Sequence, residues 1–318
     1  MKTMTRPRLV GLALVAVAAL LPAALAGTRY ANYVEHVVVQ IMLMGLYAMA
    51  WDFLNGYVGL FSFGHAAFLG AGAYTAAILI VRGGVTSAPL VLAAALAVAV
   101  LVGLVVGFLS SRVGAVAVFL VTFAVAEALY LIVLADPRGI TNGDNGLAGA
   151  VPAPLLGLDF SNPVVFYYLA LGVLVLSYLG LRALTRSQFG HVLLGIRENE
   201  LRVRFAGYEV EQYKTAAFAV SAFFAGLAGA LRAFHERIAS PETVGWAVSG
   251  DAVLYATLGG SGTLLGSILG AAIAIIAREV MSDIFRSWLI FVGLTYIVLV
   301  FFLPTGIYPL LFRTDTRR

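Results

Sequence analysis

The stretch R-A-L-T-R-S-Q-F-G-H-V-L-L-G-I-R-E-N-E-L-R-V-R-F-A-G-Y-E-V-E-Q-Y-K, residues 182–214, lies between two hydrophobic parts of this 318-residue chain. It carries six cationic and four anionic side chains. These are Arg182, Arg186, Arg197, Arg202, Arg204 and Lys214, and Glu198, Glu200, Glu209 and Glu211. A charge at the bilayer centre costs about 2.5 to 3.5 kcal/mol even on the most lenient scale. The stretch is therefore predicted to lie in water between membrane spans.

The composition of the whole chain indicates an integral membrane protein. Apolar residues make up 61% of the sequence and charged residues 11%, and the mean hydropathy is +0.97. Water-soluble domains have about 25% charged residues. The chain has no cysteine, which excludes disulfides and thiolate metal sites. The net charge of +4 fits basic flanks of membrane spans and gives little support to nucleic-acid binding.

The centre of residues 182–214 has the pattern of a short amphipathic helix. Two acid-first pairs, Glu198 with Arg202 and Glu200 with Arg204, are four residues apart, and each stabilises a helix by about 0.2 to 0.5 kcal/mol. The pattern also has an apolar stripe, an N-terminal cap and a terminating glycine: Leu194, Leu201 and Phe205, then Ser187 and Gly207. The stripe either packs on the membrane core, as in an ordinary surface loop, or binds a partner.

Hydrophobic segments on both sides predict an all-α polytopic protein, with one domain over residues 1–318 and about eight to ten transmembrane helices. The predicted segments are residues 9–26, 37–54, 90–109, 116–134, 164–181, 216–231, 244–258, 264–277 and 288–303. Segment 244–258 is short and contains Asp251, so broken or half helices are expected among them. Segment 9–26 imitates a cleavable signal peptide, but its length favours an uncleaved first span. Basic residues at both chain ends predict cytoplasmic termini.

A glycine-rich run, G-Y-V-G-L-F-S-F-G-H-A-A-F-L-G-A-G-A-Y, covers residues 56–74. Glycines this dense in a membrane segment either let another helix approach closely or mark a broken helix whose backbone meets a substrate. His65 in this run is either a hydrogen-bonded structural residue or a functional one, and the same two interpretations apply to Glu127 in segment 116–134. Small residues spaced by four further along predict helix-packing seams, at residues 222, 226 and 230 and at 262, 266 and 270.

Several chemistries are missing from the sequence. The two lysines, Lys2 and Lys214, lie in no phosphate-binding loop, and no H-E-x-x-H or G-x-S-x-G motif or catalytic carboxylate pair is present. We therefore expect no enzyme, no cofactor and no metal site, but a membrane pathway for a solute. An ion-coupled carrier would use ionisable groups within the membrane, such as His65, Glu127, Asp52 or Asp251. A permease driven by a separate ATPase would instead use the charged loop.

Four blocks resemble LivM-type permeases of ABC importers for branched-chain amino acids. The run over residues 56–76 resembles the family signature, and three blocks agree in family order: T-N-G-D-N-G-L (141–147), I-R-E-N-E-L-R (196–202) with Y-K-T-A-A-F (213–218), and L-G-G-S-G-T-L-L-G (258–266). The resemblance implies a bacterial inner-membrane importer. Its implied partners are a second homologous permease, two cytoplasmic ATPases, a periplasmic binding protein and membrane lipid. The substrate is a branched-chain amino acid or a related amino acid, amide, urea or aromatic acid.

In this resemblance residues 182–214 look like a cytoplasmic coupling loop that contacts an ATPase. The expected coupling residues are Arg197, Glu198, Glu200, Leu201, Arg204, Phe205 and Gly207. Arg204 and Phe205 stand where many relatives have an acidic and a small residue. The mechanism that the resemblance implies is alternating access around the glycine-rich run. The expected pathway residues are Ser62, Gly64, His65, Gly70, Tyr74 and Glu127.

Overall fold

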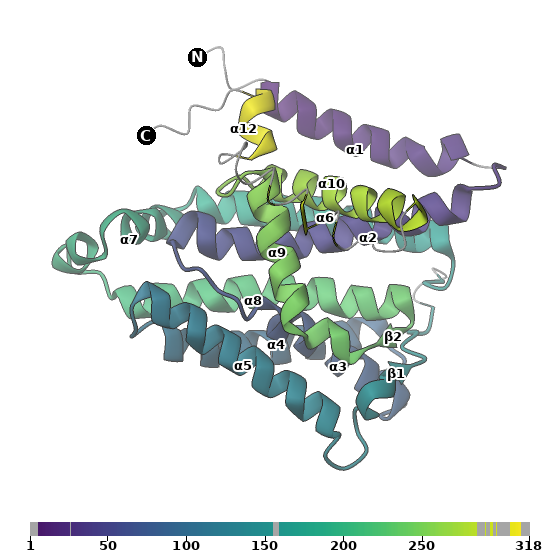
Figure 1. Ribbon diagram of the computed structural model, residues 1–318, viewed down its shortest axis with the longest axis horizontal. Helices are drawn as coiled ribbons and strands as arrows, with labels where there is room; N and C mark the ends of the chain where they lie inside the picture. Colours follow the sequence, from purple (N-terminus) through teal and green to yellow (C-terminus); the bar gives the residue numbers. More distant parts are fainter. Residues whose placement is uncertain are drawn as a thin grey trace.

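The structure is a computed structural model that describes residues 6–25, 27–154, 159–284 and 306–312, together with residues 290, 293, 294 and 297. It is almost entirely helical, with long helices packed side by side and one small two-stranded sheet at one end (Figure 1). The predicted all-α class is confirmed.

Six helices in the described part of the chain are long and apolar enough to cross a membrane. They are α2 (Ala31–Asp52) with its continuation to Val58, α4 (Ala88–Ser110), α5 (Ala115–Ala135), α6 (Pro163–Thr185), α8 (Val210–Glu236) and α10 (Leu264–Ile284). The helices α1 (Arg6–Leu25) and α3 (His65–Val81) include shorter apolar stretches. The chain is thus a multi-pass membrane protein. Most of the predicted segment 288–303 lies outside the described residues, so the total of eight to ten helices stays a prediction.

Helix α2 and the short helix α9 (Trp246–Gly259) each end in an irregular, glycine-containing segment, and for the run over residues 56–74 a broken helix is one of the two interpretations. Helix α2 ends in one π-helical segment, η1 (Phe53–Val58), and Gly59 then adopts a left-handed φ of 78° before α3 begins at His65. The second such segment follows α9, which crosses the other helices steeply in Figure 1. Gly260, with a φ of 114°, turns the chain from α9 into α10.

Helix α8 lies at the centre of the packing, against α3 and α4. A Cβ atom on Gly229 would lie 1.9 Å from the Leu69 carbonyl oxygen, and one on Gly72 would lie 2.0 Å from the Gly226 carbonyl oxygen. Between α9 and α10, a Cβ on Gly270 would lie 1.9 Å from the Tyr255 carbonyl oxygen. Backbones touch at these points, which confirms the predicted packing seams.

The block at residues 141–147 closes the end of the molecule where the small sheet lies. Asp136 ends α5, and its Oδ1 accepts hydrogen bonds from the Thr141 amide (2.7 Å) and hydroxyl (2.9 Å). Slight desolvation raises the pKa of Asp136, but these hydrogen bonds outweigh it and hold the pKa below its ordinary value. After η2 (Gly143–Asn145), strand β1 (Leu147–Ala148) pairs antiparallel with β2 (Ile238–Ala239), which ties this loop to the end of α8. The short helix η3 (Pro241–Val244) leads into α9.

We expect Gly229→Ala to destabilise the protein by about 1 to 3 kcal/mol, because the added methyl group overpacks a backbone contact. Gly172→Ala on α6 is the matched control, since a Cβ there meets nothing within 4 Å. Thermal unfolding in detergent, followed by size-exclusion chromatography, measures both. Equal midpoints for the two variants would contradict the packing seam.

Candidate functional site

The charged stretch forms helix α7 (Gln188–Phe205), which projects at the end of the molecule away from the small sheet (Figure 1). The Ser187 side chain accepts a hydrogen bond from the Gly190 amide at the start of the helix. Gly207 follows the helix with a φ of +91°. Both predicted ends of the helix are confirmed.

Helix α7 is not straight, because Asn199 breaks it. Asn199 has φ −161° and ψ 97°, and its side chain accepts a hydrogen bond from the Arg202 amide, as an N-cap does. The break falls between Glu198 and Arg202, and their predicted helical pair is not among the ion pairs of the described residues. The pair of Glu200 and Arg204 does form, at 3.3 Å.

The second half of α7 exposes its apolar side chains. Leu201 is 64% exposed and Phe205 is 87% exposed, so they do not pack on the membrane core. In the same half of the helix, Glu200 forms a 2.6 Å ion pair with Lys214, whose side chain is almost completely buried. The ion pair anchors this half of the helix to the start of α8 and leaves its apolar face free for another molecule.

Arg197 connects α7 to the broken end of α2. Its guanidinium donates a hydrogen bond to the Gly56 carbonyl oxygen within η1. A Cβ atom on Gly59 would lie 3.0 Å from the Arg197 side chain, so the glycine there lets the arginine pass. We call Arg197, η1 and the turn after α9 the junction.

Asp52 binds the turn after α9, which is the third part of the junction. Its fully buried carboxylate accepts hydrogen bonds from the Gly262 amide (2.7 Å) and the Ser261 hydroxyl (3.1 Å). Asn55 donates to the same serine at 2.9 Å. A Cβ on Gly56 would lie 2.6 Å from the Gly262 Cα atom. The glycine-rich turn after α9 therefore rests directly on η1.

Ser62 and His65 lie in a buried hydrogen-bond network that joins α2, α3 and α8. The His65 Nδ1 lies 3.0 Å from the Ser62 Oγ, and the Nε2 lies 2.8 Å from the Ser221 Oγ. The Ser221 hydroxyl donates to the Ala50 carbonyl oxygen at 2.6 Å. All three polar side chains are completely buried.

The donors in this network assign one form of the imidazole. Ser221 uses its only hydroxyl proton on Ala50, so it accepts a hydrogen bond from the Nε2–H of His65. The Nδ1 atom then accepts from the Ser62 hydroxyl. Both ring nitrogens are engaged by protein groups, which favours the structural interpretation of His65 in this conformation.

The two glycines of the predicted pathway lie in tight packing contacts. A Cβ on Gly64 would lie 2.1 Å from the Thr122 carbonyl oxygen of α5, and one on Gly70 would lie 2.5 Å from the Val244 side chain. Tyr74 is 5% exposed, and its hydroxyl has no hydrogen-bond partner within the described residues. Glu127 is partly buried on α5, with no hydrogen bond or ion pair to the part of the chain that the structure describes. Of the predicted pathway residues, Tyr74 and Glu127 therefore have polar side-chain atoms without a partner in the described structure.

A cavity of about 200 Å³ lies at the end of the molecule opposite α7, where α2 begins and α8 ends. It combines one acidic group, one basic group, two imidazoles and several apolar side chains. Among its lining residues are Glu35, Arg237, His36, His235, Val39, Phe160, Phe166 and Phe234. Glu35 is 4% exposed, and its Oε2 has no partner among the described residues, as is also true of the His235 Nε2. We call it the outer cavity.

Sequence reasoning did not find the junction or the outer cavity. Asp52 and Gly262 are 210 residues apart, so no local pattern links them. The sequence indicated Asp52 as an ionisable residue at a span end and as one candidate group of an ion-coupled carrier, but not its contact with Gly262. The structure also pairs Asp251 with Arg278 at 3.3 Å. Asp251 and the Oδ1 of Asp52 are therefore engaged by protein groups, whereas the buried Oδ2 of Asp52 has no hydrogen-bond partner among the described residues.

The fold and these features define a multi-pass permease with a projecting, partly apolar charged helix. Residues 33–303 match the family described as "Branched-chain amino acid transport system / permease component". The chain belongs to this family of transport permeases.

Two relatives are "High-affinity branched-chain amino acid transport system permease protein LivM" from Escherichia coli (strain K12) and its namesake from Salmonella typhimurium (strain LT2). Each is 30% identical over 194 residues, which cover 54% of this chain and 46% of the relative. The chain thus spans about half the length of these curated relatives. This agrees with the LivM-type resemblance of the four blocks. No solved structure matches the chain.

We expect Ser221→Ala to destabilise the protein by about 1 to 3 kcal/mol, because it leaves the buried His65 Nε2–H without an acceptor. Ser282→Ala is the control, since Ser282 is exposed and bonds only to its own helix in the described structure. Thermal unfolding in detergent compares them. If Ser221→Ala were as stable as the control, the network would not hold α2, α3 and α8 together.

Proposed function

We propose that this chain is the membrane permease subunit of an ABC importer in the bacterial inner membrane. It takes up branched-chain amino acids or related small solutes from the periplasm, and separate ATPase subunits drive it. The family match supports the class of transporter. The observation that carries the ATPase coupling is the exposed apolar face of α7 at Leu201 and Phe205, because exposed apolar groups of this size on a charged helix mark a protein contact.

The proposed orientation places α7 and both chain termini in the cytoplasm. Basic residues concentrate in α7 and at the two ends of the chain, which agrees with the positive-inside rule. The loop between α5 and α6, with the small sheet and the outer cavity, then faces the periplasm. A binding protein delivers solute at that face, and a second homologous permease completes the pathway.

In this mechanism the junction transmits motion from the ATPases to the membrane helices. ATPase closure moves α7, and Arg197 carries that displacement to the Gly56 carbonyl within η1. Asp52 passes it to the turn at Gly262 and so to α9 and α10. Alternating access follows when these interrupted helices change their tilt while the backbone contacts around α8 stay fixed.

The proposed pathway runs beside α3 and α5. Tyr74 and Glu127 offer polar atoms that no described protein group uses. The other predicted residues fix the position of α3 beside the pathway, through hydrogen bonds and close packing against α2, α5, α8 and η3. They are Ser62, Gly64, His65 and Gly70.

The outer cavity has the chemistry to receive an amino acid with an apolar side chain. A zwitterion needs an anionic partner for its ammonium group and a cationic partner for its carboxylate, which Glu35 and Arg237 provide. The apolar lining residues fit a branched aliphatic side chain. This supports an amino acid over urea or a simple amide as the solute.

An ion-coupled carrier is the alternative function. The hydrogen bonds of His65 and the ion pair of Asp251 count against it, because these two side chains are already bound to protein groups. Uptake that survives ATP depletion but collapses with an uncoupler would favour the carrier.

In vesicles reconstituted with the second permease, the ATPases and the binding protein, leucine uptake is expected to require ATP. Phe205→Ser should lower uptake and transport-stimulated ATP hydrolysis by about thirtyfold, since loss of a large side chain that is buried in the contact costs about 2 kcal/mol. Phe205→Leu keeps the apolar surface and is the matched control. Copurification of the ATPases reports the contact directly.

The two parts of this experiment have different consequences. Uptake by the isolated chain without any ATPase would refute the proposed function. Normal ATPase binding by Phe205→Ser would remove only the exposed face of α7 from the contact.

We also expect Glu35→Gln to raise the KM for leucine uptake about tenfold, because a charge-assisted hydrogen bond to the ammonium group is lost. Glu242→Gln is the control at the same end of the molecule, since Glu242 is exposed and does not line the cavity. Initial uptake rates over a range of leucine concentrations measure the effect. An unchanged KM would exclude the outer cavity from solute binding.

A further inference from the structure

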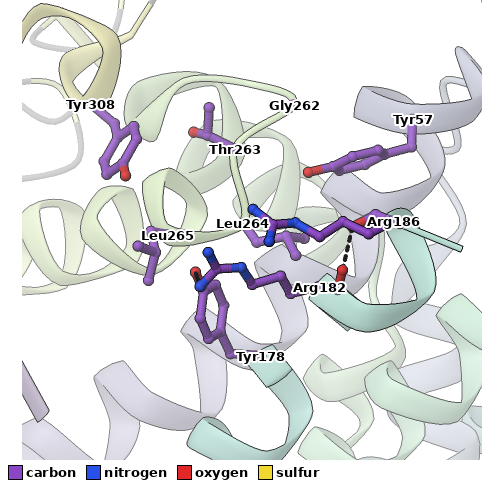
Figure 2. A pocket seen from close by; sticks show the side chains of 10 residues that line it. Tyr57, Tyr178, Arg182, Arg186, Gly262, Thr263, Leu264, Leu265 and Tyr308 are labelled. Carbon is purple, nitrogen blue, oxygen red and sulfur yellow. Dashed lines mark hydrogen bonds between the residues drawn. The ribbon is translucent and has the colours of Figure 1, made fainter. Parts of the chain in front are cut away.

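A second cavity, of about 220 Å³, lies beside the junction, where α6 ends and α10 begins. Three tyrosines, two arginines and residues around the start of α10 line most of it: Tyr57, Tyr178 and Tyr308, Arg182 and Arg186, and Thr263, Leu264 and Leu265. Figure 2 shows the Arg182 and Arg186 side chains extending side by side, with both guanidinium groups turned toward the same space. We call it the basic cavity.

The positive charge in the basic cavity is not neutralised by the described part of the protein. Arg182 donates a 3.2 Å hydrogen bond to the Tyr178 hydroxyl, which is uncharged. Neither Arg182 nor Arg186 forms an ion pair with a carboxylate of the described residues. Two like charges that face one cavity repel each other, so an anion between them would stabilise the arrangement.

The start of α10 adds to the positive potential. Thr263 precedes this 21-residue helix, and Leu264 and Leu265 of its first turn line the cavity. The first amide groups of a helix lack partners within the helix and carry the positive end of its dipole. The cavity therefore meets guanidinium groups on one side and a helix N-terminus on the other.

The surface of α6 shows which kind of anion fits. Leu176 is 70% exposed and Leu179 is 51% exposed, and Arg182 and Arg186 follow at helical spacings of three and four on the same face. An apolar strip thus leads along the membrane-spanning helix to the basic cavity at its end. A free phosphate would contact only the cavity, whereas a phospholipid would contact the cavity with its head group and the apolar strip with its acyl chains.

We propose that the basic cavity binds the head group of an anionic phospholipid, whose acyl chains lie along the exposed face of α6. The phosphate accepts hydrogen bonds from Arg182 and Arg186, in the manner of basic pockets between transmembrane helices. Because Tyr57 of η1 and Gly262 belong to the same cavity, the bound lipid braces the junction. The site requires no ATPase and does not depend on the proposed transport function.

The test is lipid binding to the full chain in a mild detergent, measured by native mass spectrometry. The probes are short-chain phosphatidylglycerol, phosphatidylcholine with the same acyl chains, and inorganic phosphate. We expect Arg182→Gln with Arg186→Gln to weaken phosphatidylglycerol binding about tenfold or more. Each arginine near an anionic lipid contributes to the binding free energy, and the contribution of two arginines exceeds the free energy of a roughly tenfold change in affinity. Phosphatidylcholine binding should be weaker and unaffected.

Arg112→Gln is the matched control. Arg112 also lies at the end of a membrane helix, but it stacks on the Phe108 ring, 4.3 Å from its centroid, and does not line the cavity. If the double variant does not fold, Arg186→Gln alone serves, because Arg186 is exposed. The proposal would be overturned if Arg112→Gln weakened phosphatidylglycerol binding as much as the cavity variant does. It would also be overturned if a folded variant of Arg182 and Arg186 bound phosphatidylglycerol as well as the unchanged protein. If inorganic phosphate displaced phosphatidylglycerol at similar concentrations, the ligand of the basic cavity would be a soluble anion, and the lipid proposal would be wrong.

Discussion

Direct contact between backbones around α8 is the constraint on which the rest of the structure depends. Apolar side chains gain little from each other in a membrane, since the lipid is equally apolar, so helices associate by close packing. Gly72 and Gly229 let α3 and α8 approach until one helix touches the carbonyl oxygens of the other. Gly103 also lets α4 pack closely on α8, because a Cβ there would lie 2.4 Å from the Ala222 Cβ. These contacts hold α3, α4 and α8 together as one rigid group.

The interrupted helices follow from a second constraint, that backbone groups at membrane depth need partners. Where α2 gives way to η1, the Gly56 carbonyl accepts from Arg197, and the turn after α9 donates its Gly262 amide to Asp52. Both partners are side chains, and the backbones of Gly56 and Gly262 are also in close contact. In the proposed mechanism, the junction therefore moves together with α7, to which Arg197 attaches it.

Local patterns in the sequence predicted the all-α membrane fold, most helices and the ends of α7, because hydropathy, caps and glycine spacing act over short distances. They missed the break at Asn199, since its side chain replaces one helical hydrogen bond without changing the charge pattern. They left the role of His65 open. Its partner Ser221 is 156 residues away, and no pattern within the glycine-rich run indicates that contact. Local patterns likewise could not predict the junction, the outer cavity or the basic cavity, because each of them brings together residues from at least three separate segments of the chain.

The buried polar groups fall into two sets, those that are fully hydrogen-bonded within the protein and those that have an atom without a partner among the described residues. Ser62, His65 and Ser221 satisfy each other completely and join three helices at the centre, so they contribute stability and leave no site for a solute. By contrast, Glu35 and Tyr74 have buried oxygen atoms that no described group binds, as do Asp52, Ser110 and Ser267. A buried polar atom without a partner costs about 1 to 3 kcal/mol. The fold tolerates that cost at the outer cavity and beside α5, and a passing zwitterion would recover part of it at each place.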